Sequence, residues 1–258
     1  WTLMLLDGSE LNTPKEREKW DLKSKFRIIP RDFVKFKSGK VVMEIEEVGI
    51  GTNALSFNDY VELRLFSLII KIISATPCYR SIFKFMKFYD VKIFDLAFSM
   101  LKNTNLSSKK LQIFFEEFKQ YTIDELWDSE AELIEHYQNP MEYEKLLNGS
   151  AGQNVAFYFH AIAISDHMSD FTDFVIQNSR ALLENDTIDD FNSQLNSIEQ
   201  YCKGSCENIF GEDRLKSNPE FMFDYDILTW MNTGVTTSLK SFKLDQKSKI
   251  KFSLTQEQ

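Results

Sequence analysis

Apolar and polar residues alternate in short segments over the first fifty positions, which is the pattern of β-strands. Residues 1–6 form a continuous apolar run ended by a polar turn, and such a run is typical of a strand buried on both faces. Further strand-like segments lie at residues 26–29, which Pro30 stops, and at residues 33–36 and 40–48. Gly39 lies between the last two and predicts a hairpin turn, because glycine tolerates a positive φ. Thr13-Pro14 predicts the start of a short helix between the strands.

A spacing of about 3.6 residues between apolar positions begins at Ser56 and predicts helices. Ser56 is a suitable N-cap for the first helix, and Thr76-Pro77 ends it. Further helices are predicted at residues 81–89, 93–102, 108–121, 123–137, 153–167, 171–183 and 188–202. Thr122 and Glu125 have the spacing of a capping box at the start of one of them. Asn139-Pro140 is predicted to be a turn.

These patterns predict a mainly α protein, a helical bundle with a small β-containing N-terminal segment and a short mixed C-terminal tail. Residues 1–55 are expected to form the β segment and residues 56–210 the bundle. Residues 211–258 are expected to form a mixed tail that packs back on the β segment.

Composition narrows the classes of partner. With 258 residues and 43% hydrophobic content the chain can bury a large core, and its 23 Phe predict that this core is aromatic. A net charge of −9 argues against nucleic acid as a partner, because phosphate binding needs a basic surface. The longest apolar run, residues 65–73, is interrupted by Lys71 and is too short for membrane insertion. Three cysteines without a paired framework, and no signal peptide, predict a cytoplasmic protein.

Several segments resemble the far end of the catalytic barrel in radical S-adenosylmethionine (radical SAM) enzymes, in the group that also carries a cobalamin-binding domain. They are MLLDGSEL at residues 4–11, FRIIPRDF at 26–33, EIEE at 44–47, the T-N-x-L-S-F-x-D-Y run at 52–60, FMFDYDILTW at 221–230 and KIKFSLTQEQ at 249–258. The match covers about a quarter of the chain. It implies that residues 1–55 are the end of a partial barrel. It also implies S-adenosylmethionine, a [4Fe–4S] cluster and cobalamin as cofactors of the full-length parent.

The cysteines of this chain do not have the spacing that such a cluster needs. Radical SAM enzymes hold the cluster with a C-x₃-C-x₂-C loop, and its irons need thiolates at that spacing. Cys202 and Cys206 have the first spacing, but Ile209 follows them and Cys78 is distant in sequence. We therefore expect no cofactor within this chain and interpret it as a C-terminal fragment whose cluster loop lies upstream.

Two acidic and two basic residues are candidate substrate-binding groups. Glu44 and Glu46 are two positions apart in a predicted strand, so they share one of its faces. They could line a barrel mouth, serve acid–base chemistry, meet the guanidinium groups of Arg27 and Arg31, or belong to a solvated edge strand. Arg31 also suits bidentate contact with a substrate carboxylate or phosphate.

Other polar positions have weaker signals. Asp7, Ser9 and Glu10 follow the first strand and lie either near a bound ligand or in an ordinary turn, and Glu10 is added to the substrate-binding candidates. His160 and His167 are seven positions apart, two helical turns, which is too far for a shared metal, so no metal site is predicted. No catalytic residue is assigned.

The function that these observations predict is that of a C-terminal accessory and barrel-closing region of a radical SAM enzyme, one that is inactive without its upstream domains. Upstream domains of the same polypeptide and a small or carbohydrate-like substrate are the expected partners. The alternative is a stand-alone helical interaction or scaffold module without catalysis, which the acidic composition and the lack of a complete catalytic motif favour.

Overall fold

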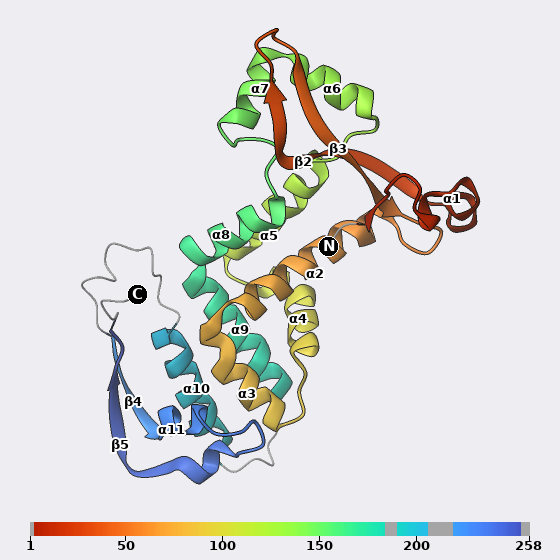
Figure 1. Cartoon of the computed structure of the whole chain (residues 1–258). Helices are drawn as coiled ribbons and strands as arrows, with labels where there is room; N and C mark the ends of the chain where they lie inside the picture. Colours follow the sequence, from red (N-terminus) through yellow and green to blue (C-terminus); the bar gives the residue numbers. More distant parts are fainter. Residues whose placement is uncertain (1–2, 184–189, 206–218, 254–258) are drawn as a thin grey trace. The chain divides into compact units, whose positions relative to one another are not determined.

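The computed structural model describes residues 3–183, 190–205 and 219–253 (Figure 1). The described chain is mainly helical, with a small N-terminal antiparallel sheet and a C-terminal strand pair, so the predicted fold class is confirmed. It divides into two compact units, Trp1–Leu68 with Phe114–Phe159, and Ile69–Ile113 with His160–Gln258. This division differs from the three consecutive segments predicted above, because residues 114–159 belong with the N-terminal sheet rather than with the other helices.

The first unit is built on a three-stranded sheet with the order β1-β3-β2. Its strands are β1 (Leu3–Met4), β2 (Lys23–Lys35) and β3 (Val41–Gly51), and all pair antiparallel. Its helices are α1 (Pro14–Trp20), α6 (Glu130–Gln138) and α7 (Pro140–Leu147), with the 3₁₀ helix η1 (Glu10–Asn12). The β2–β3 hairpin lies beside α6 and α7, which cover it with a core of Ile28, Val41, Leu133, Tyr137, Tyr143 and Leu146 (Figure 1).

Three long helices contribute to both units. They are α2 (Phe57–Ala75), α5 (Lys109–Asp124) and α8 (Val155–Ser165). The predicted start of α2 is confirmed, because Ser56 Oγ accepts a hydrogen bond from Asp59 N at 3.1 Å and Asp59 Oδ2 accepts one from Ser56 N at 3.0 Å. The hairpin turn is also confirmed, with Gly39 at φ +88°.

The second unit is helical with a two-stranded sheet. Its helices are α3 (Arg80–Phe88), α4 (Ile93–Lys102), α9 (Met168–Leu183), α10 (Phe191–Ser205) and α11 (Ile227–Met231). Its strands are β4 (Glu220–Tyr225) and β5 (Lys243–Lys251), and its 3₁₀ helices are η2 (Pro77–Tyr79), η3 (Thr104–Leu106) and η5 (Leu239–Phe242). Strand β4 pairs with β5 and packs against α10, so the tail belongs to this unit. Large aromatic side chains fill the core, as predicted: Tyr79, Phe85, Phe171, Phe223, Tyr225 and Trp230.

Two predictions about the N-terminal strands are wrong. Among the described residues, β1 consists of Leu3 and Met4, and both are more than 40% exposed, because β1 is an edge strand whose described pairing is with β3. Pro30 does not end its strand either. β2 continues to Lys35 because the ladder shifts register between Ile28 and Phe33, and this bulge removes the proline from the pairing.

Two predictions about helix boundaries are also wrong. Thr122 is buried inside α5 and caps nothing, whereas Ser129 Oγ accepts a hydrogen bond from Glu132 N and starts α6. Asn139 is an N-cap rather than part of a turn, since its Oδ1 accepts from Met141 N at 2.9 Å at the start of α7. No helix within the described ranges has the length and apolar character that crossing a membrane requires.

Candidate functional site

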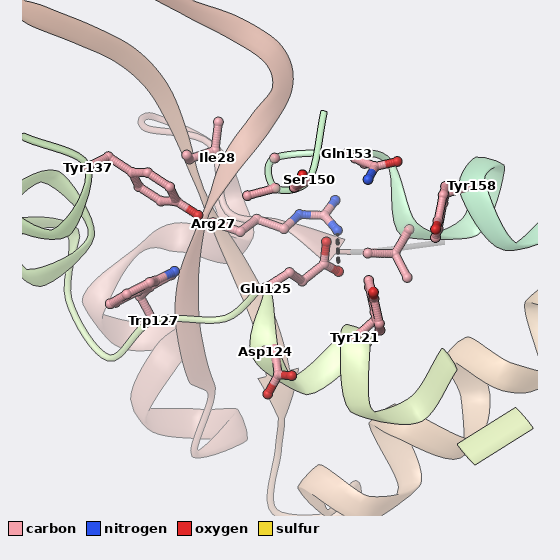
Figure 2. Close-up of a pocket in the computed structure, with 13 residues that line it drawn as sticks. Arg27, Ile28, Tyr121, Asp124, Glu125, Trp127, Tyr137, Ser150, Gln153 and Tyr158 are labelled. Carbon is pink, nitrogen blue, oxygen red and sulfur yellow. Dashed lines mark hydrogen bonds and ion pairs between the residues drawn. The ribbon is translucent and has the colours of Figure 1, made fainter. Parts of the chain in front are cut away.

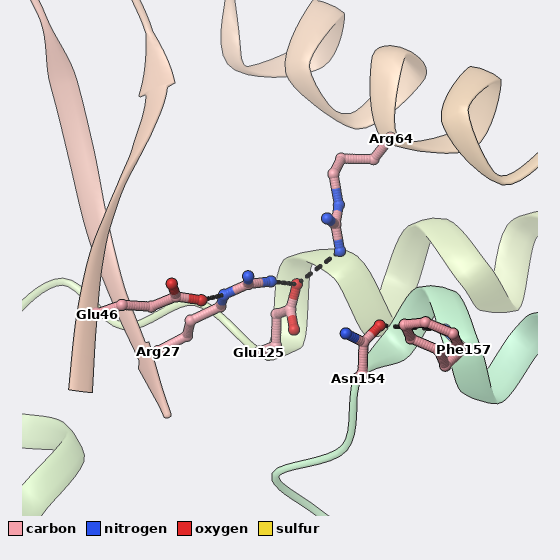
Figure 3. A network of polar contacts seen from close by, with 6 residues as sticks. All are labelled: Arg27, Glu46, Arg64, Glu125, Asn154 and Phe157. Carbon is pink, nitrogen blue, oxygen red and sulfur yellow. Dashed lines mark hydrogen bonds and ion pairs between the residues drawn. The ribbon is translucent and has the colours of Figure 1, made fainter. Parts of the chain in front are cut away.

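Four charged side chains of the first unit form a continuous network (Figure 3). Arg27 and Glu46 lie directly opposite each other on β2 and β3, and Arg27 Nε donates to Glu46 Oε1 at 2.5 Å. Arg27 Nη1 donates to Glu125 Oε1 at 2.9 Å, just beyond the end of α5. The same Glu125 oxygen accepts from Arg64 Nη2 of α2 at 3.1 Å. The network therefore ties the sheet to two helices of the unit.

The network is largely withdrawn from solvent. The exposed fractions of its side chains are 7% for Glu46, 12% for Arg27, 14% for Glu125 and 7% for Arg64. Two carboxylates balance two guanidinium groups, which is what allows charges to lie at this depth.

Burial and pairing act in opposite directions on the pKa values of this network. Burial raises the pKa of Glu125, and the positive charges of Arg27 and Arg64 oppose that effect without cancelling it. For Arg27 burial disfavours the charged form, but the carboxylates of Glu125 and Glu46 outweigh it, so the pKa of Arg27 is raised. The net effect is that the pKa of both Arg27 and Glu125 is raised above its usual value.

Two further polar atoms beside the network are buried. Tyr60 is 5% exposed, and neither its hydroxyl nor the Nε of Arg64 has a hydrogen-bond partner among the described residues. Burial raises the pKa of the Tyr60 phenol. Both residues also line a small apolar cavity of about 290 Å³ next to the network.

A larger cavity, of about 340 Å³, opens over Arg27 and Glu125 (Figure 2). We call it the Arg27 cavity. Its wall consists of Arg27 and Ile28 of β2, residues around the end of α5, Tyr137 of α6, the loop at residues 150–153 and the beginning of α8. A volume of this size is typical of small-molecule sites.

Aromatic rings and polar side chains share the wall of the Arg27 cavity. Tyr121 stacks on Tyr158 with ring centroids 6.1 Å apart, and both rings are partly exposed. Trp127 also lines the cavity and is held by a backbone bridge to Phe26, with Trp127 N donating to Phe26 O at 2.8 Å. The remaining polar lining residues are Asp124, Ser150 and Gln153. The cavity thus offers ring faces together with hydroxyl, amide and carboxylate groups.

The structure brings together two of the five predicted substrate-binding residues. Arg27 and Glu46 meet, which was one of the predicted alternatives, and Arg27 also lines the cavity. Glu44 is exposed and makes no hydrogen bond or ion pair among the described contacts, although it shares a strand face with Glu46. Glu10 is exposed in η1, and Arg31 is exposed at the bulge of β2 with φ +69°. None of these last three lines the Arg27 cavity.

Sequence reasoning missed Arg64, Glu125 and the aromatic wall. Glu125 was interpreted as part of a capping box. A signal for Arg64 was present, since Tyr60, Arg64 and Leu68 are spaced by four on α2 and share its buried face. A charged residue on a buried stripe requires a buried partner, and the sequence does not say which one.

The other candidates show no site chemistry within the described ranges. No group of three His, Cys, Asp or Glu residues there could hold a metal ion. His160 lies on α8 while His167 follows that helix, so the predicted shared helix is wrong. Cys202 is a buried free thiol whose pKa burial raises, and Cys78 is disulfide-bonded, contrary to the expected absence of pairing. Cys206 and Ile209 of the incomplete cluster motif lie outside the described residues.

Comparison with known proteins adds no assignment to these observations. No protein-family model matches the chain, and no curated protein is significantly similar to it.

Proposed function

We propose that the first unit binds a small hydroxylated, sugar-like molecule in the Arg27 cavity, and that it does so as an accessory region of a radical SAM enzyme. The observation that carries the binding proposal is the composition of the cavity wall. Stacked tyrosines, a tryptophan, the neutral hydrogen-bonding groups of Ser150 and Gln153 and the carboxylate of Asp124 surround an arginine whose charge is already balanced.

The balanced charge decides the class of ligand. Glu46 and Glu125 already accept from Arg27, so the guanidinium offers little net attraction to an anionic ligand. Ring faces such as those of Tyr121 and Tyr158 pack well on the C–H face of a sugar, and Ser150 and Gln153 supply hydrogen bonds that fix its orientation. A neutral polyol can pack its C–H groups on the tyrosine rings and form hydrogen bonds with Ser150 and Gln153.

The radical SAM part of the proposal rests on the sequence resemblance. Two residues that carry the resemblance, Arg27 and Glu46, also pair with each other in the charged network, and Arg27 lines the cavity. The described residues do not fit a [4Fe–4S] cluster, since they contain no cluster-forming set of ligands. In addition, every described strand ladder is antiparallel, whereas a βα barrel uses parallel strands. The described sheets therefore lend no support to the partial barrel, which stays a prediction from the sequence resemblance. The reaction would begin at groups that the upstream domains supply.

The binding proposal is tested by calorimetric titration of the chain with neutral monosaccharides, acyclic polyols and, for comparison, sugar phosphates. We expect saturable binding of a neutral compound and a loss of about tenfold in affinity for Tyr158→Ala, the size of one lost ring contact. Phe157→Ala is the matched control, because Phe157 is the neighbouring aromatic residue, is 63% exposed and does not line the cavity. Absence of saturable binding, or equal affinities of the two variants, would refute the assignment.

The parent enzyme is tested separately. A C-x₃-C-x₂-C loop encoded upstream of residue 1, together with an iron–sulfur absorption band in the longer protein, would support it. A start codon directly before residue 1 would contradict it and favour the non-catalytic interaction module. That alternative has one structural observation in its favour, the exposed aromatic pair Phe94 and Phe98 on α4, whose ring centroids are 6.0 Å apart.

A further inference from the structure

The second unit contains a cavity that the proposed function does not use. It has a volume of about 480 Å³ and is formed by α3, the turn between α3 and α4, and Val235. We call it the α3–α4 cavity. Among its lining residues are four cations, Arg80, Lys84, Lys87 and Lys92, and one carboxylate, Asp90. Such an excess of positive charge is notable because the chain as a whole has a net charge of −9.

The spacing along α3 places three of these cations together. Arg80, Lys84 and Lys87 follow one another at intervals of four and three residues, which is the spacing of neighbours on one helix face. Helix α3 ends at Phe88, and the chain turns through Asp90, whose φ is +59°, before α4 begins after Lys92. The turn therefore brings the fourth cation to the same cavity.

Lys84 is a fixed and buried positive charge. It is 8% exposed, and its ammonium donates to the carbonyl oxygens of Trp230 and Thr233 and to Thr233 Oγ1, the last two at 2.9 and 3.1 Å. It also lies 4.4 Å from the centroid of the Trp230 ring. These partners are neutral, so they hold the ammonium in place without cancelling its charge.

The other three cations are exposed and available. None of the ion pairs between described residues involves Arg80, Lys87 or Lys92, and Asp90 takes part in none either. The cavity therefore has three exposed cations that form no ion pair among the described contacts, against the single carboxylate of Asp90. Their combined field favours a negatively charged group at this rim.

Apolar side chains complete the α3–α4 cavity. Phe83, Val91, Ile93 and Val235 line it, and Ile93 and Val235 are each more than 40% exposed. An inorganic anion would leave this surface in contact with water. A ligand with a hydrocarbon portion would cover it and gain about 25 cal/mol for each Å² removed from water.

We propose that the α3–α4 cavity binds an amphipathic anion, a hydrocarbon chain that carries a phosphate or carboxylate group. The anionic group lies among Arg80, Lys87 and Lys92 in the field of Lys84, and the chain covers Ile93 and Val235. The same chemistry occurs in a free alkyl phosphate and in a phospholipid, so the test separates the two sources. This proposal concerns a different unit and does not depend on the sugar-like ligand of the Arg27 cavity.

The test is calorimetric titration of the chain with octyl phosphate, octanol and inorganic phosphate. We expect octyl phosphate to bind at least about tenfold more tightly than either of the others, since each supplies only half of the interaction. Higher salt should weaken binding, because the rim charges are exposed and screened. The double variant Arg80→Gln, Lys87→Gln should lose about tenfold in affinity, the loss of two exposed charge contacts.

The matched control is Lys109→Gln, Lys110→Gln, which removes the same charge from exposed positions of α5 in the same unit. Equal affinities of the two double variants would overturn the proposal, as would equal binding of inorganic and octyl phosphate or no binding at all. Flotation with vesicles of phosphatidylcholine containing phosphatidylglycerol identifies the source. Binding that depends on Arg80 and Lys87 indicates a lipid, whereas octyl phosphate binding without flotation indicates a free anion, and either result supports the site.

Discussion

Arg27 and Glu125 are separated by 98 positions in the chain, yet Arg27 Nη1 donates to Glu125 Oε1 at 2.9 Å. This contact joins β2 to the end of α5, and Arg64 extends it to α2 through the same carboxylate oxygen. Glu125 therefore occupies the centre of the network, and both guanidinium groups depend on its charge. Arg27 and Glu125 both line the Arg27 cavity, and the contact between them is the basis of the first prediction.

Glu125→Gln should destabilise the first unit by about 3 kcal/mol, because it leaves a buried positive charge without compensation. Urea unfolding followed by circular dichroism measures the change, with a constant m-value showing that the folded state is retained. Glu116→Gln is the control, since Glu116 lies on α5 in the same unit and its side chain is 75% exposed. A variant at Glu125 that was as stable as the control would contradict the structural importance of the network.

The pairing of Glu47 predicts a dependence of stability on pH. Burial would raise the pKa of Glu47, but hydrogen bonds from Arg17 and Ser24 outweigh it and hold the pKa below its usual 4.5. The folded state then releases this proton more readily than the unfolded state, so the stabilisation is complete above pH 4.5 and disappears as pH falls through the folded pKa.

Glu47→Gln should accordingly flatten the fall in unfolding free energy below pH 4.5, measured by urea unfolding at a series of pH values. Glu44→Gln serves as the comparison, because Glu44 is on the same strand, is exposed and has no ion pair among the described contacts. Identical pH profiles for the two variants would show that the Arg17 contact has no effect on the titration of Glu47.

The loop at residues 150–153 should be sensitive to a methyl group at Gly152. Its φ is +65°, and a Cβ there would lie 2.7 Å from Leu146 Cδ2. Gly149 has φ +78° but open space around it, so Gly149→Ala isolates the backbone strain, about 1 kcal/mol. Gly152→Ala should destabilise by about 1 kcal/mol more because of the added clash, and it should weaken ligand binding to the Arg27 cavity. Thermal unfolding of both variants decides whether the clash contributes.

Arg31 offers the opposite test, a substitution that should stabilise. Its φ of +69° strains any residue with a Cβ, so Arg31→Gly should raise stability by up to about 1 kcal/mol. Asp32→Gly, at the next exposed position of β2, has no such strain to relieve and should lower stability by about 0.5 kcal/mol. If urea unfolding showed Arg31→Gly to be the more damaging change, the side chain of Arg31 would make a stabilising contact that outweighs the strain of its positive φ.

Local chemistry explains which elements were predictable. The caps and the turn that were recognised from sequence depend on residues no more than four positions apart. They are the hydrogen bond between Ser56 and Asp59, the hydrogen bond between Thr13 and Glu16, and the positive φ of Gly39 in its turn. The predictions at Pro30 and Thr122 were wrong because distant contacts overrode the local signal. A bulge against β3 accommodates the proline, and the threonine is buried within α5, which continues past it.

The candidate site was predictable only in part, for the same reason. Register on β2 and β3 places Arg27 opposite Glu46, and a pairing of these residue types was among the predicted alternatives. Three other residues of the site lie more than 35 positions from Arg27 in the chain: Glu125, Arg64 and Trp127. The sequence around each of them does not indicate that it lies beside Arg27 in the folded protein.

The sequence by itself determined the mainly helical class, the ends of several elements and the acidic balance of charge, because these depend on composition and on hydrogen bonds between near neighbours. Only the tertiary structure decided the division into two units, the four-residue network and the three cavities. Buried charges must find compensation wherever packing brings it, and cavities form where surfaces from distant segments fail to fill space. Neither property belongs to any single stretch of the chain.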